Sequence, residues 1–167
     1  MARGTRARQP STTENEAINH RGHRGHRVGI TAEHVHINEL SEQVIGAAIT
    51  VHRELGPGML ESTYERCMAL ELRERGVSFE RQKRLPVVFK GTPIDFGYRV
   101  DMLVDARLVL ELKAVKALEP VHHAQLLAYL KLSGCHVGLL INFNVHVLRS
   151  GITRLVRGSP DAPPDNR

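Results

Sequence analysis

Two acidic residues and a lysine on neighbouring predicted strands are the residues of this sequence best suited to chemistry. The segment 98–113 reads YRVDMLVDARLVLELK, with two apolar runs around the polar break 105–107. Aliphatic runs of this length separated by a turn signal predict a β-hairpin. If residues 105–107 form a three-residue loop, Asp101 lies directly across from Glu111, and Lys113 shares one face of its strand with Glu111.

The predicted proximity of Asp101 and Glu111 raises an electrostatic problem. Directly opposed residues have Cβ atoms about 4.5–5.5 Å apart, so two carboxylates there repel each other. A divalent cation such as Mg²⁺ or Mn²⁺, which prefers carboxylate oxygens and water, would resolve the conflict. The alternative is a solvated hairpin edge with a weak salt bridge, because an acid-x-Lys triplet arises by chance about once in a chain of this size. A loop of even length would place the two acids on opposite faces.

The composition predicts one domain in the cytoplasm. A chain of 167 residues with 41% apolar residues can bury a proper core. No apolar run approaches the roughly 20 residues of a membrane span, and the N-terminus lacks the apolar segment of a secretory signal. Cys67 and Cys135 lie in apolar-periodic segments, which is typical of reduced thiols in a cytosolic protein. We therefore expect no membrane partner.

The net charge of +5 is unevenly distributed. Residues 1–27 hold six Arg against two Glu, so the remainder is close to neutral. Basic tails favour nucleic acid through phosphate contacts, but solvated disorder of the same composition is also common. Aromatic residues make up only 4% and Trp is absent, which argues against a stacking platform for single strands. We expect a disordered basic tail at 1–35 (or an over-long start), a folded domain at 36–157 and a disordered tail at 158–167.

The hydrophobic period changes along the chain from helical to strand-like and back. Asn38 can cap the first helix, and the Gly-Pro-Gly sequence at 56–58 separates it from the second. The basic stretch 81–84 is expected to be a solvated edge between two short strands, and it is also the best candidate for phosphate contacts in the folded part. The expected elements are helices at 38–55 and 59–75, strands at 77–79, 85–89, 94–104 and 108–113, a helix at 120–133, and strands at 136–142 and 145–149. This order predicts an α/β fold in which helices cover a mixed sheet.

Helical spacing groups several other polar residues. Glu61 and Tyr64 lie three apart in the first turn of the second helix, and are therefore neighbours. An acid at this position also favours the helix dipole, and Tyr64 matches the apolar stripe of the helix. Gln125 and Tyr129 lie four apart on the third helix and share a face beside His122. A Gln–Tyr pair of this kind is ordinary by itself.

Several segments together resemble a known family. Residues 58–64 fit the pattern G-x-x-E-x-x-Y that names the GxxExxY protein family. The segments VHRELGPGMLESTYE, YRVDMLVD, LELKAV, HHAQLLAYL and GLLINF look like that family in the same order, from about residue 40 to residue 155. The family is similar to the PD-(D/E)XK nuclease superfamily. The resemblance therefore implies a restriction-endonuclease-like fold, with two helices before the sheet and one after the strand that carries Glu111 and Lys113.

The resemblance also implies roles for individual residues. Asp101 and Glu111 match the two metal-binding acids, Lys113 matches the motif lysine, and Glu61 matches an acid supplied by the preceding helix. These four are the expected catalytic residues, and the three acids the expected metal ligands. One departure is that Val100, instead of Pro, precedes Asp101, at a position that varies widely.

A second group of residues is expected to contact the substrate or support the acids. Gln125 and Tyr129 match the Q-x-x-x-Y element of the recombination-associated nucleases in that superfamily. Tyr64, from the G-x-x-E-x-x-Y segment, and His122, from the segment of Gln125 and Tyr129, are placed in the same group.

The implied activity is metal-dependent hydrolysis of phosphodiester bonds, with DNA favoured over RNA as the substrate. Mg²⁺ or Mn²⁺ would lower the pKa of a bound water and clamp a phosphate oxygen, while Lys113 would orient the water or stabilise developing charge. The alternative is a non-catalytic module that binds nucleic acid or protein and keeps the nuclease fold. The near-neutral folded part argues against tight independent binding of a duplex. It leaves room for a protein partner that delivers the substrate, a homodimer that pools charge, or a contact through the basic tail.

Overall fold

The structure is a computed structural model that describes residues 32–158, without the side chains of residues 32–36, 95 and 96. Most of the two expected tails, at 1–35 and 158–167, lies outside the described residues. Of the first tail, residues 32–35 are described and are helical, and of the second only Gly158 is described. The elements in chain order are α1 (Ala32–Leu55), α2 (Glu61–Glu74), β1 (Phe79–Phe89), β2 (Thr92–Val104), β3 (Leu108–Lys113), α3 (Pro120–Ser133), β4 (Val137–Asn142), the 3₁₀ helix η1 (Leu148–Gly151) and β5 (Ile152–Val156).

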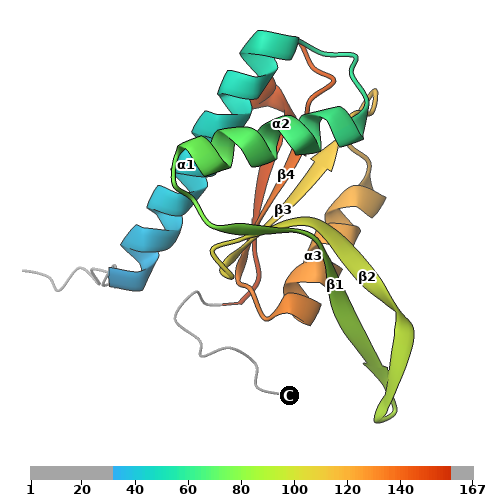
Figure 1. Ribbon diagram of the computed structural model, residues 1–167. Helices are drawn as coiled ribbons and strands as arrows, with labels where there is room; N and C mark the ends of the chain where they lie inside the picture. Colours follow the sequence, from blue (N-terminus) through green and yellow to red (C-terminus); the bar gives the residue numbers. More distant parts are fainter. Residues whose placement is uncertain (1–31, 159–167) are drawn as a thin grey trace, which may run out of the picture.

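The five strands form one mixed sheet in the order β1-β2-β3-β4-β5. Neighbouring strands are antiparallel except for β3 and β4, which are parallel and joined by the crossover helix α3. Helices α1 and α2 cover one face of the sheet and α3 covers the other (Figure 1). This confirms the predicted α/β class, with two helices before the sheet and one after β3.

The hairpin between β2 and β3 has the predicted register. Val104 pairs with Leu108 and Met102 pairs with Leu110, which leaves a three-residue loop at 105–107. Asp105 and Ala106 adopt φ angles of 50° and 52°. Successive residues with positive φ give the turn a twist that matches the right-handed twist of the two strands. The odd loop length therefore sets which side chains of β2 and β3 face each other.

Strand β3 is the centre of the core because both of its faces are covered. Leu108, Leu110 and Leu112 pack with the side chains of α1 and α2, whereas Val109 packs with α3. Glu111 lies within the same strand and retains only 2% of its surface exposed. Since charged residues are rarely buried without a partner, its burial singles out this end of the sheet. Among the described residues, no helix is long and apolar enough to cross a membrane.

Three predicted boundaries were wrong. Helix α1 begins at Ala32, so Asn38 lies inside it and is not a cap; its Oδ1 accepts a hydrogen bond from Arg154 Nη2 at 3.0 Å. The basic stretch 81–84 does not separate two strands, because β1 runs unbroken from Phe79 to Phe89 and pairs with β2 along this stretch. It does lie at the edge of the sheet, where Arg81 and Arg84 are exposed.

The third error concerns the end of the sheet. The segment expected as a strand at 145–149 forms bends and the start of η1, and the last strand follows at Ile152–Val156. Its alternating sequence resembles a strand, but the chain must first reverse direction to run antiparallel to β4. Leu148 is buried in that reversal, which explains its apolar character.

Candidate active site

Asp101 lies where strands β2 and β3 separate. The paired residues of the two strands end at Met102 and Leu110. Beyond that pair, the Oδ2 atom of Asp101 accepts a hydrogen bond from the backbone N–H of Leu112 at 2.9 Å. A side-chain oxygen thus takes the place of a backbone carbonyl, and the carboxylate is held between the two strands.

Strand β2 also turns about its own axis at Asp101. Val100 and Leu103 belong to the same core cluster against α3, although strict alternation would put them on opposite faces. Across the strand pair, Gln82 has a φ of 50° and lies between the paired residues Arg81 and Lys83. The pairing of β2 with β3 ends at this point, at Met102 and Leu110.

Glu111 and Lys113 form an ion pair at the end of β3. Lys113 Nζ donates to Glu111 Oε1 at 2.6 Å, and both side chains are largely shielded from solvent. The other carboxylate oxygen, Glu111 Oε2, is buried and has no hydrogen-bond partner within the part of the chain described. Since a buried unpaired oxygen of this kind is energetically unfavourable, Glu111 has an unused site for a cation or a donor.

Glu61 is brought to the same end of the sheet by the turn between α1 and α2. Gly58 has a φ of +96°, a conformation that a side chain would strain. The Tyr64 hydroxyl donates to the carbonyl of Gly56 at 2.6 Å and accepts from the N–H of Met59 at 3.1 Å. The G-x-x-E-x-x-Y pattern therefore has a physical basis: the glycine makes the turn, Glu61 begins the helix, and the tyrosine fixes the turn.

Tyr64 is entirely buried and stacks on Phe143, with the ring centroids 4.3 Å apart. Its burial does not favour the substrate contact predicted for it, because its side chain has no exposed surface. It acts on Glu61 through the turn.

The pKa values show that the three predicted acids and the lysine interact. Burial raises the pKa of Glu61 and of Asp101, and the Asp101 charge raises that of Glu61 further. Burial and then the charge of Asp101 raise the pKa of Glu111 to about 7, outweighing its ion pair with Lys113. Burial alone would lower the pKa of Lys113, but Glu111, Glu61 and Asp101 raise it above its ordinary value. The four side chains therefore lie within electrostatic range of one another, and are called the acidic cluster below.

The donor set of this cluster fits a hard divalent cation. Three carboxylates with raised pKa values and one unpartnered oxygen are what a bound Mg²⁺ or Mn²⁺ would stabilise. Within residues 32–158, however, no three His, Cys, Asp or Glu side chains are already arranged around a common metal position. The ammonium of Lys113 lies on Oε1 of Glu111 in this arrangement, and Oε2 is the oxygen left for a cation.

Glu65 is a further acidic residue that the sequence interpretation missed. It lies one turn after Glu61 and is only 7% exposed. Its Oε1 accepts from Arg81 Nε at 2.8 Å and its Oε2 from Gln82 Nε2 at 2.7 Å, and Gln82 Nε2 also lies 3.4 Å from Asp101 Oδ1. The i, i+4 spacing from Glu61 was the available signal. Glu65 ties α2 to β1 and sets the position of the Gln82 side chain beside Asp101.

Gln125 and Tyr129 are adjacent on α3, as their spacing predicted. Gln125 Nε2 donates to the Tyr129 hydroxyl, and the Tyr129 ring contacts Tyr98 edge-on at 5.7 Å. Burial raises the pKa of Tyr129, and the charges of Glu111 and Asp101 raise it further, which places its hydroxyl within electrostatic range of the acids.

His122 has a structural role at the start of α3. Its Nδ1 accepts from the backbone N–H of Glu119 at 2.9 Å, and the Glu119 side chain accepts from the backbone of His122 in return. This reciprocal capping uses one ring nitrogen of His122. The structure gives no contact between His122 and the acidic cluster, so its predicted support of the acids acts at most through the position of α3.

Comparison with known proteins shows the superfamily of this chain. The family model of the PD-(D/E)XK nuclease superfamily matches residues 38–155. The chain belongs to the PD-(D/E)XK nuclease superfamily. Searches of curated proteins and of solved structures gave no match. Membership confirms the resemblance at the level of the superfamily and indicates a nuclease-type function on nucleic acid, while the narrower GxxExxY grouping stays a prediction.

In this PD-(D/E)XK chain, Asn142 supports the end of the strand that carries Glu111 and Lys113. Asn142 pairs with Lys113 across β3 and β4 and is 2% exposed. Its Oδ1 accepts from the N–H of Val115 at 3.1 Å, and its Nδ2 donates to the carbonyl of Val115 at 2.8 Å. The sequence signal for Asn142 was a single polar residue that ends an otherwise apolar run.

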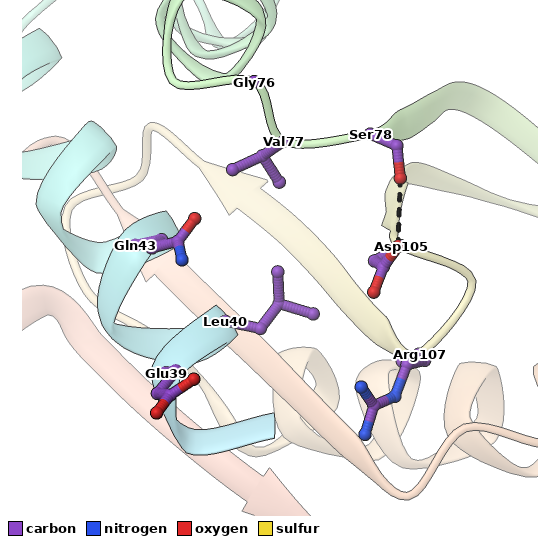
Figure 2. A pocket seen from close by; sticks show the side chains of 8 residues that line it. All are labelled: Glu39, Leu40, Gln43, Gly76, Val77, Ser78, Asp105 and Arg107. Atoms are coloured by element: carbon purple, nitrogen blue, oxygen red, sulfur yellow. Dashed lines mark hydrogen bonds between the residues drawn. The ribbon is translucent and has the colours of Figure 1, made fainter. Parts of the chain in front are cut away.

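A hollow of about 250 Å³ lies at the opposite end of β3 from the acidic cluster of this PD-(D/E)XK chain. Ser78 donates to Asp105 at its rim (Figure 2). Arg107 lies just before β3 and Lys113 ends it, so about 20 Å separate the two ends at the usual rise per residue. The hollow is therefore separate from the site. Its lining residues are Glu39, Leu40, Gln43, Gly76, Val77, Ser78, Asp105 and Arg107.

Proposed function

We propose that this protein is a metal-dependent nuclease that hydrolyses phosphodiester bonds in DNA, with Mg²⁺ or Mn²⁺ held by Asp101, Glu111 and Glu61. The observation that carries the proposal is Glu111 Oε2, a buried carboxylate oxygen without a partner in a cluster of mutually repelling acids. A structural ion pair alone would not leave that oxygen unsatisfied. Superfamily membership supports the reaction class, and the choice of DNA over RNA is part of the proposal.

Each side chain has a distinct task in this proposal. Asp101 and Glu111 present oxygens from two strands that have just separated, and Glu61 adds one from the start of α2. A cation bound there would supply an activated water and neutralise a phosphate oxygen. Lys113 would orient the water or stabilise negative charge as it develops on the phosphate.

Tyr129 and Gln125 would act on the substrate. Their paired hydroxyl and amide lie on α3 within electrostatic range of Glu111 and Asp101. Neither is a strong ligand for a hard cation. A hydrogen bond from this pair to the sugar-phosphate backbone would hold the scissile group at the acidic cluster.

The full chain, incubated with single-stranded and duplex DNA and with RNA, tests the proposal. We expect cleavage of DNA with Mg²⁺ or Mn²⁺, none with EDTA, and a loss of at least about 100-fold in Asp101→Asn and in Lys113→Ala, because these changes remove charge from the reacting centre. Glu74→Gln, which removes an exposed acid at the end of the same helix as Glu61, is the matched control and should cleave like the wild type. Melting temperatures verify that each variant folds.

Two results would overturn the proposal. One is no cleavage of any of these substrates with either metal. The other is equal cleavage by the wild type and Asp101→Asn. Cleavage of RNA alone would keep the metal-dependent chemistry and reject DNA as the substrate.

A non-catalytic binding module is the second candidate. The observation in its favour is that Lys113 already neutralises Glu111, so the cluster is partly satisfied without a metal. This candidate predicts nucleic-acid or protein binding that does not change in Glu111→Gln. The described residues 32–158 hold 16 Lys and Arg against 14 Asp and Glu, which leaves a role for a second copy or a protein partner that adds positive charge. In either case we propose a cytoplasmic location, supported by two free thiols.

A further inference from the structure

Strands β1 and β2 extend past the rest of the sheet as a two-stranded ribbon. Strand β3 pairs with β2 only over residues 102–104, although β2 is 13 residues long. The outer part of the hairpin therefore has no third strand beside it and projects from the body of the molecule (Figure 1). An isolated ribbon buries little surface, so its length requires an explanation other than the core.

Two arginines face each other directly on this ribbon. Arg84 on β1 pairs with Arg99 on β2, and both are exposed. Like charges directly opposite on a strand pair destabilise it. Within the described part of the chain neither arginine contacts a carboxylate, whereas their neighbours do: Arg81 pairs with Glu65 and Lys83 with Glu80. The opposed pair is thus left for an anion from outside the chain.

The ribbon bends next to this arginine pair. The register of β1 and β2 shifts between Leu85 and Val87. Opposite this shift, a Cβ atom on Gly97 would lie 2.3 Å from the carbonyl oxygen of Leu85, so only glycine fits there. An irregularity of this kind bends and twists a strand pair. The bend is therefore built into the sequence at the position of the two arginines.

The ribbon also has a net positive charge. Residues 79–104 hold five Lys and Arg against three Asp and Glu, a net charge of +2. Residues 32–158 as a whole have the same net charge. The remaining described residues are neutral. The net positive charge of the ribbon attracts phosphate groups.

We propose that the β1–β2 ribbon binds duplex DNA beside the acidic cluster, with Arg84 and Arg99 on phosphates that flank the cleaved bond. This rests on the proposed nuclease function and names the element that holds its substrate. Arg99 is two residues from Asp101, or about 7 Å along the strand, close to two nucleotide steps of rise. A duplex is the occupant because the major groove admits a two-stranded β-ribbon. The exposed Val88, Phe89 and Ile94 at the tip would lie in that groove.

Anisotropy titrations of a short fluorescent DNA duplex test the proposal with the full chain in EDTA, where no cleavage occurs. The test variant is Arg84→Gln/Arg99→Gln. The matched control is Arg73→Gln/Arg149→Gln, which removes two exposed arginines from α2 and η1. Both variants keep the Arg-rich N-terminal segment, so its contribution cancels in the comparison.

Loss of two phosphate contacts should make the slope of log binding constant against log salt concentration shallower by about 1.8, measured between about 0.05 and 0.3 M. Binding near 0.1 M salt should weaken on the order of 50-fold. The control should keep the wild-type slope. The melting temperature of the test variant should stay equal or rise, because an opposed like-charge pair is removed. A purely structural role would instead lower it without changing the slope.

Three results would overturn this proposal. The first is a test variant and a control with the same slope. The second is an equal loss of affinity for a single strand of the same length, which would remove the argument for a duplex. The third is an unchanged DNA affinity together with a changed mass in sedimentation, which would assign the ribbon to self-association. Because binding is measured without metal, a failure of cleavage would leave this result intact, and a failure of binding would leave the cleavage test intact.

Discussion

Asp101 accepts a hydrogen bond from the backbone N–H of Leu112 at 2.9 Å, so an acidic side chain of β2 completes the hydrogen bonding of β3. The same carboxylate raises the pKa of Glu111 on β3. Asp101 is therefore both a structural link between the two strands and a source of electrostatic strain. Substitutions at this position should separate the two roles.

Asp101→Asn should keep the fold and abolish cleavage. The amide oxygen can still accept from Leu112, and loss of the negative charge relieves the repulsion on Glu111. Its melting temperature should equal or exceed that of the wild type without metal. Asp101→Ala should lose about 1–3 kcal/mol of unfolding free energy, because the N–H of Leu112 loses its partner. Denaturant titrations of both variants check the difference, and an Asn variant less stable than Ala would contradict it.

The metal-free protein should become less stable as the pH rises from about 4.5 to about 7. Glu111 has a pKa of about 7 in the folded protein, against 4.5 for an ordinary glutamate. In that range the folded state binds a proton more tightly than the unfolded state, so the unfolding free energy falls with rising pH. The contribution of Glu111 is about 3 kcal/mol in total.

Denaturant titrations at several pH values in EDTA measure this dependence. Glu111→Gln has no proton to lose at this position and serves as the reference, so its unfolding free energy should change less over the same range. If the two proteins show parallel curves, Glu111 is not the group responsible. If the unfolding free energy of the wild type instead rises with pH relative to that of Glu111→Gln, the prediction is contradicted.

Metal binding should compete with protons at Glu111. A cation requires the ionised carboxylate, and the pKa of Glu111 is raised to about 7 by burial and by Asp101. The apparent affinity for Mn²⁺ should therefore weaken by up to about tenfold per pH unit below 7. Calorimetric titrations in two buffers of different ionisation heat should show proton release on binding at pH 7. Glu111→Gln should bind more weakly and release fewer protons, and equal release by both proteins would exclude Glu111 as a ligand.

The register of the β2–β3 hairpin followed from the sequence because it depends on local rules, although the strand pairing ends one residue before Asp101 and Glu111. A three-residue loop and the alternation of strand residues together set which residues of β2 and β3 oppose each other. The same local rules gave the limits of α3, where Pro120 begins the helix and Gly134 ends it. Neither inference required knowledge of any distant contact.

The missed features depend on contacts between distant elements. Glu65 is buried because Arg81 and Gln82 reach it from β1, and those two residues read from the sequence as an exposed basic stretch. The orientation of the Gln82 side chain follows from its positive φ, which a glutamine in the sequence does not predict. Asn142 likewise becomes important only when β4 lies beside β3. Periodicity finds the elements but not the polar bonds that join them.

Tyr64→Phe should impair the site without removing any acid. The substitution keeps the ring on Phe143 but removes the hydroxyl that joins Gly56 to Met59, so the turn before Glu61 loses two hydrogen bonds. We expect a loss of about 1–2 kcal/mol in unfolding free energy, together with weaker Mn²⁺ binding and slower cleavage, since Glu61 is then less well positioned. Tyr98→Phe, which removes a hydroxyl from a half-exposed ring, is the control. If Tyr64→Phe is less stable but binds Mn²⁺ and cleaves at saturating metal as the wild type does, the tyrosine serves the fold alone and does not position Glu61.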